Sequence, residues 1–219
     1  IAVSQLSFAE SSRIALNFGM SAISIVGGLI SVIMGAALIA KEVQNRTLYL
    51  VLTKSIWRWQ FVVGRFLGLL GVLALNSLLM ISILMVVYKA QGGSFQKEIF
   101  ESLLLQISEF AVLAAMAAIF SAFSTTTLSV IFASGVWVIG HAISDLRILS
   151  DKIEPVFVRP FFKFIVHVLP DLNRFDIKAQ VAHGLTVTWG YTALGMLYAF
   201  AYIVFALSLS CLLFSRRDL

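Results

Sequence analysis

Long apolar runs alternate with short polar segments along the whole chain. Each of five runs is long enough to cross the roughly 30 Å hydrocarbon core of a bilayer as a helix, at about 1.5 Å per residue. Helices are expected because a segment in lipid must satisfy its own backbone hydrogen bonds. The pattern therefore predicts an all-helical, polytopic membrane protein with spans at 14-40, 61-88, 102-122, 125-143 and 186-214.

The third and fourth runs follow each other with no charged residue at their junction. As one helix, residues 102-143 would be about 63 Å long, roughly twice the thickness of the hydrocarbon core. The stretch SAFSTTT at 121-127 is therefore predicted to contain a turn between Ser124 and Thr127.

Composition agrees with this pattern, since 60% of the residues are hydrophobic and 12% are charged. Residues 1-219 are predicted to form a single transmembrane domain, because the longest connection between spans, 144-185, is short for a second domain. The net charge of +5 comes from basic residues that flank the spans. Such flanking charge is typical of topology signals and argues against a nucleic-acid partner.

Lysines and arginines are concentrated on one side of the predicted bundle. The segments 41-65, 121-127 and 215-219 carry seven of them beside two acids, whereas the other side has nine spread among eight acids. Basic connections tend to stay in the cytoplasm, so we predict that these segments are cytoplasmic, in a bacterial inner membrane.

This orientation leaves residue 1 outside the cytoplasm, on a chain that begins with Ile and lacks a signal peptide. We expect a further spanning helix upstream, which would give six in the full subunit. The alternative is a five-span chain with an exported N-terminus.

The cytoplasmic loop at 41-60 combines positive charge with an apolar patch, LYLVL at 48-52. Glu42 and Arg46 are four residues apart, a spacing that brings opposite charges together on one helix face. We interpret the loop as a short helix at the membrane surface. The alternative is that its charge only orients the flanking helices, a role that needs no apolar patch.

The stretch KEVQNRTLYLVLTKSIWRWQFVVGRFLG at 41-68 resembles the signature of type-2 ABC transporter permeases. That signature has an acidic residue, a Thr, a Leu-rich stretch, a Lys-Pro or similar pair, an Arg, and a Gly followed by a basic residue. The matching positions are Glu42, Thr47, Leu50 to Leu52, Lys54, Arg58, Gly64 and Arg65, with Ser55 where many relatives have Pro. LPDLNRFDIK at 169-178 and the SRRDL ending are similar to further patterns of the family.

The resemblance implies a permease subunit of an ATP-driven exporter, with 41-60 as a coupling helix that docks on a separate ATP-binding cassette subunit. The ATPase-coupling residues would be Glu42, Arg46, Thr47, Leu50, Lys54 and Arg58. ATP and Mg would be bound by the partner chain, because this sequence has no G-x-x-x-x-G-K-[ST] phosphate loop. The subunit itself would have no cofactor and no enzyme activity, and it would pair with a second permease copy as a homodimer.

Ionisable residues inside spans are costly and are therefore candidates for function. Glu109, counted from Ser102, is predicted to lie about 10 Å into the third span, with His141 at similar depth. The two could contact a substrate or proton on the translocation path, or they could form an interhelical hydrogen bond or a contact between subunits. Asn76 is a further candidate for the path or for interhelical contact.

The connection at 144-185 contains VFVRPFFKFIVHVL, which is too short to span the bilayer and too apolar for water. We predict an external interfacial or re-entrant helix. Arg159, Lys163 and His167 follow at a spacing of four and would form one polar stripe, which meets lipid headgroups or an anionic substrate, or simply reaches water.

Two other functions are compatible with these features. The subunit could transmit ATP-driven motion to an extracytoplasmic partner protein without moving a solute. It could also be a lipid-modifying membrane enzyme that uses Glu109 or His141 as acid or base. The three histidines have no spacing typical of a metal site.

Overall fold

The computed structural model of the chain describes residues 2-44, 57-92, 97-152, 166, 168-182 and 185-215. Within these ranges the elements are α1 (Ala2–Gln44), α3 (Arg58–Ala90), α4 (Lys97–Phe123), α5 (Thr126–Lys152), the 3-10 helix η1 (Leu172–Phe175), α7 (Lys178–Ala182) and α8 (Trp189–Ser215). Among the described residues, five helices are long and apolar enough to cross a membrane. The predicted all-helical fold class is therefore confirmed.

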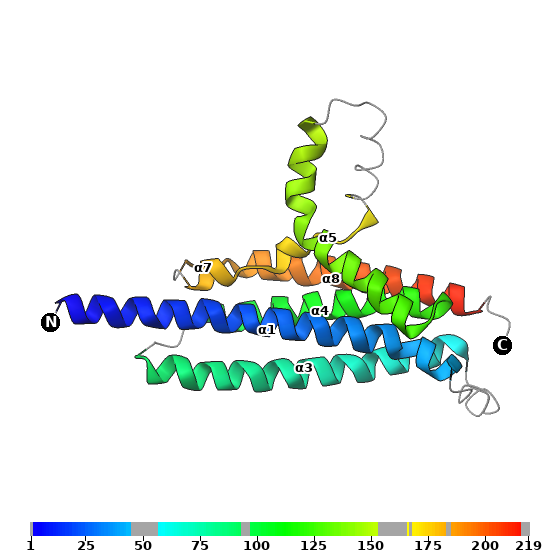
Figure 1. Cartoon of the computed structure of the whole chain (residues 1–219), viewed down its shortest axis with the longest axis horizontal. Coiled ribbons are helices and arrows are strands. Elements are labelled where there is room, and N and C mark those ends of the chain that lie inside the picture. The colour runs from blue at the N-terminus through cyan, green and yellow to red at the C-terminus, as the bar shows by residue number, and fades with distance from the viewer. Residues whose placement is uncertain are drawn as a thin grey trace.

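The long helices α1, α3, α4 and α8 run side by side along the long axis of the molecule (Figure 1). One end of the bundle holds the end of α1, the start of α3 and the end of α8, and we call it the coupling end. The opposite end, which holds the end of α3 and the start of α8, is called the far end. α7 lies toward the far end in the same view.

Helix α4 is the centre of the bundle, because it packs against both α1 and α8 over much of its length. Its most apolar window is 78% buried, against 22% for the windows in α3 and α8. Small residues allow this packing: a Cβ built on Gly35 of α1 would lie 2.7 Å from the carbonyl oxygen of Ala114 in α4. The alanine-rich end of α4 therefore serves close helix contact within the subunit.

The predicted turn between the third and fourth spans is present. Helix α4 ends at Phe123 and α5 begins at Thr126, so the chain reverses over two residues. The length argument therefore located this turn without any charged residue to mark it.

Helix α5 differs from the prediction at its end. The predicted span stops at 143 and 144-185 was assigned to an external connection, whereas α5 continues to Lys152. Figure 1 shows the later part of α5 standing away from the other long helices. The polar residues after 143 end the apolar run, but they are compatible with a helix, so the helix outlasts the hydrophobic pattern.

Residues 169-177 return into the bundle after α5. The side chains of Leu172, Phe175 and Ile177 are each no more than 1% exposed. The Asn173 side-chain amide donates to the His141 carbonyl oxygen (2.6 Å) and to Ser144 Oγ (3.1 Å), so it ties η1 to α5. The predicted interfacial helix around Arg159, Lys163 and His167 lies outside the described residues.

Candidate functional site

The coupling end brings the two sides of the predicted coupling loop together. Helix α1 ends at Gln44 and α3 begins at Arg58, and the two ends lie beside each other in Figure 1. Gln60 Oε1 accepts the backbone N–H of Trp57 at 3.1 Å, which fixes the entry into α3. The predicted coupling residues Arg46, Thr47, Leu50 and Lys54 lie outside the described residues.

Glu42, in the last turn of α1, forms an ion pair with Arg65 in the second turn of α3. Glu42 Oε1 accepts from Arg65 Nη2 at 2.5 Å, and the two residues are 23 positions apart in the chain. The Glu42 side chain is 15% exposed and the Arg65 side chain 40%, so the carboxylate is the better shielded of the two partners. The spacing-based prediction paired Glu42 with Arg46, and the structure gives Arg65 as a partner that sequence spacing missed.

Two aromatic residues extend this contact to α8. The Arg65 guanidinium carbon lies 5.2 Å from the centre of the Phe61 ring, within cation–π range. The Phe61 ring in turn stacks on Phe214, at 6.4 Å between ring centres. Phe214 is fully buried near the end of α8. The ends of α1, α3 and α8 are therefore joined around one arginine.

Ser121 joins α4 to the same end of α1. Its Oγ accepts the backbone N–H groups of Ile39 (2.9 Å) and Ala40 (2.8 Å). α1 is nevertheless one continuous helix from Ala2 to Gln44. Ile39 and Ala40 lie three and two residues before Glu42, so α4 is bonded to α1 directly beside the turn that carries Glu42.

Glu109 and His141 meet in the interior of the bundle, as the sequence suggested. His141 Nε2 lies 3.4 Å from Glu109 Oε1, and the side chains are 30% and 1% exposed. His141 Nδ1 is 3.1 Å from the carbonyl oxygen of Trp137. Glu109 is twelve residues into α4, about 18 Å from its start. The predicted depth of about 10 Å was counted from Ser102, whereas α4 begins five residues earlier, at Lys97.

Asn76, the third polar candidate, is half-buried on α3. In the described parts of the chain it is not among the hydrogen-bonding partners of Glu109 or His141. It therefore does not belong to the same interior contact.

Two further acids of α4, Glu98 and Glu101, were not singled out by the sequence. They are 9% and 4% exposed, and Glu101 Oε2 is buried without a hydrogen-bond partner among the described residues. The apolar pattern begins at 102, so both residues were assigned to the preceding loop. The most central helix of the bundle therefore carries three buried carboxyl groups.

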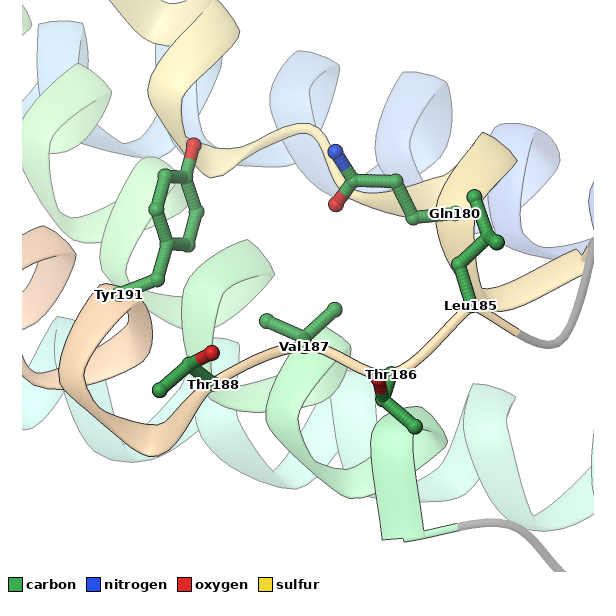
Figure 2. Close-up of a pocket in the computed structure, with 6 residues that line it drawn as sticks. All are labelled: Gln180, Leu185, Thr186, Val187, Thr188 and Tyr191. Atoms are coloured by element: carbon green, nitrogen blue, oxygen red, sulfur yellow. The ribbon is translucent and has the colours of Figure 1, made fainter.

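A pocket of about 440 Å³ opens near the far end, lined by Gln180, Leu185, Thr186, Val187, Thr188 and Tyr191. Figure 2 shows Gln180 and Tyr191 on opposite sides of it, joined by the extended segment that leads into α8. The Tyr191 hydroxyl donates to the Arg174 carbonyl oxygen at 2.8 Å. The lining that the structure describes offers hydroxyl and amide groups, which suit hydrogen bonding but supply no acid–base pair.

The comparison with known families covers almost the whole chain. No curated protein matches the chain. A family described as "ABC-2 family transporter protein" matches residues 2-219, which include every helix and contact described above. The chain is therefore an integral membrane protein that belongs to the ABC-2 family of transporter permeases.

Proposed function

We propose that the chain is the permease subunit of an ABC transporter, in which ATP hydrolysis on a separate subunit drives export of a substrate or its extraction from the membrane. The observation that carries the proposal is the Glu42–Arg65 pair. It joins the two ends of the predicted coupling loop, in a chain that belongs to a transporter family over residues 2-219.

The contacts at the coupling end suggest how force on the loop would reach the bundle. A subunit that pulls or pushes on 45-56 acts on the last turn of α1 and the first turns of α3. Arg65 links these turns to each other, and the Phe61–Phe214 stack links them to α8. The hydrogen bonds from Ile39 and Ala40 to Ser121 would pass motion of the end of α1 on to α4.

The proposal includes partners and orientation. ATP and Mg would be bound by the ATP-binding cassette subunit, and a second copy of this permease would complete a homodimer. The subunit would lie in a bacterial inner membrane, with its coupling end facing the cytoplasm. Transport would run outward, from the cytoplasm or the membrane.

A charge-exchange experiment tests the coupling role of the pair. Glu42→Arg and Arg65→Glu should each lower the ATPase activity of the purified complex in lipid nanodiscs by about fivefold or more, equivalent to about 1 kcal/mol. The double variant Glu42→Arg/Arg65→Glu restores opposite charges and should recover much of the loss. Lys97→Glu, a charge reversal at the far end, is the matched control.

The result separates the alternatives clearly. If a phosphate-loop ATPase co-purifies with the wild type and the double variant recovers activity, the pair transmits coupling. If no ATPase co-purifies with folded protein, the transporter proposal is wrong. Equal activity in all four forms would show that the pair has no role in coupling.

A further inference from the structure

The segment before and within η1 is held against α8 by two tyrosines. The backbone N–H of Asp171 donates to the Tyr198 hydroxyl at 2.8 Å, and the Tyr202 hydroxyl donates to the Leu169 carbonyl oxygen at 3.4 Å. The two rings contact each other, with 4.8 Å between their centres. Residues 169-175 and α8 therefore form one continuous surface.

Two guanidinium groups lie on that surface. Arg174 sits over the Tyr198 ring, with 4.9 Å between its guanidinium carbon and the ring centre. Asp171 Oδ2 is 3.6 Å from Arg174 Nε and 4.0 Å from Arg147 Nη2. Both separations exceed hydrogen-bond length, and the Asp171 carboxylate lies between the two cations. Each arginine side chain is about half exposed, at 52% for Arg147 and 51% for Arg174.

An apolar groove continues from the tyrosines along α8. It has a volume of about 320 Å³ and is lined by Val168, Ala201, Tyr202 and Phe205. Val168 is 43% exposed and Phe205 is 56% exposed. Because α8 is long and apolar enough to cross a membrane, this exposed groove lies at the depth of the hydrocarbon core.

The order of these features along α8 matches an amphiphile. Tyr198, below Arg174, is nine residues from the far-end start of α8, or about 13 Å along the helix. Phe205 is sixteen residues from that start, or about 24 Å. The cations thus lie toward the far end and the groove runs toward the bilayer centre. Asp171 carries one negative charge beside these two cations, so the cluster keeps a net positive charge.

We propose that Arg174, Arg147 and the α8 groove form a binding site for an anionic phospholipid of the leaflet at the far end. The planar guanidinium groups bind the phosphate through paired N–H donors, as Arg does with phosphate generally. One acyl chain of the same lipid lies along Ala201 and Phe205. The site does not depend on ATP coupling, so it stands or fails separately from the proposed transporter function.

The test measures lipid preference of the purified complex in vesicles, by electron paramagnetic resonance with spin-labelled phosphatidylglycerol and phosphatidylcholine. The wild type should prefer phosphatidylglycerol by about fivefold, the effect of one cation near an anionic lipid. Arg174→Gln and Arg147→Gln should each lose most of that preference. Lys97→Gln removes a charge from the far end of α4 without touching the groove and should keep it.

A second pair of variants tests the groove. Ala201→Trp fills it and should displace the bound lipid, whereas Phe200→Trp, on the neighbouring exposed position, should not. Soluble glycerol 3-phosphate should not compete at concentrations where the lipid does.

Three outcomes would overturn the proposal: no preference in the wild type, equal loss in Lys97→Gln and Arg174→Gln, or full competition by glycerol 3-phosphate. Gel filtration of each variant identifies loss of folding. The milder Arg174→Lys keeps the charge and loses the planar fork, so its preference should fall between those of wild type and Arg174→Gln.

Discussion

The buried carboxyl group of Glu109 depends on its contact with His141. Its side chain is 1% exposed in the middle of the most buried helix, and His141 is 3.4 Å away on α5. A buried polar group that loses its partner destabilises a protein more than the intact contact stabilises it. The pair is therefore expected to hold α4 and α5 in register.

The stability of Glu109 variants tests this role. Glu109→Ala should lower the free energy of unfolding by about 1–3 kcal/mol, because it leaves a gap and removes the partner of His141. Glu109→Gln keeps a hydrogen-bonding group of the same size and should cost less. Thermal unfolding in detergent, followed by circular dichroism, measures the difference. Equal melting temperatures for the two variants would contradict the structural role.

The sequence predicted this contact for a simple reason: the predicted third and fourth spans contain only one ionisable residue each, Glu109 and His141. The Glu42–Arg65 contact was harder to predict, because 23 residues and a loop separate the partners. Arg65 was noted only as part of a family pattern. Glu98 and Glu101 were missed because acids at the end of an apolar run look like loop residues.

At the scale of helices, close approach between α1 and α4 depends on Gly35. A Cβ at this position would lie 2.7 Å from a backbone oxygen that cannot rotate away. By contrast, a Cβ at Gly68 of α3 would have no atom within 4 Å. A side chain is therefore excluded at Gly35 of α1 but has room at Gly68 of α3.

Matched alanine variants make this difference measurable. Gly35→Ala should destabilise the subunit by about 1–3 kcal/mol, because α1 must move away from α4. Gly68→Ala should be neutral or stabilise by about 0.5–1 kcal/mol, because alanine favours the helix. Chemical or thermal unfolding of both variants in one detergent tests the prediction. A stabilising Gly35→Ala would show that the two helices are not in close contact.

The five helices could be predicted because length and hydrophobicity alone decide whether a segment spans lipid. The extension of α5 to Lys152 could not, since the hydrophobic pattern marks where a membrane ends and not where a helix ends. The packing of 169-177 was also missed. Its buried residues, Leu172, Phe175 and Ile177, are too few and too irregularly spaced to show a helical or strand period.

For the whole molecule, the two ends of the bundle are proposed to lie on opposite sides of the membrane. The coupling end is proposed to face the cytoplasm and the far end to face outward. Gln60, exposed at the start of α3, and Lys97, exposed at the start of α4, mark the two ends. The two positions should therefore be reached from opposite sides of the membrane.

Single-cysteine labelling tests this topology. In a Cys211→Ser background, Lys97→Cys should react with a membrane-impermeant maleimide in intact cells. Gln60→Cys should react only after the membrane is opened. Labelling of both positions in intact cells would contradict the five-span arrangement, and the reverse pattern would invert the orientation.

The central place of α4 has a consequence for how the protein is made. The helix with the buried carboxyl groups is synthesised before α8, the partner that covers much of it, and Ser210 of α8 donates to Ala118 of α4 at 3.0 Å. A nascent chain that ends before α8 would leave uncovered the part of α4 against which α8 packs. The bundle around α4 is therefore expected to reach its final packing only after α8 has been inserted.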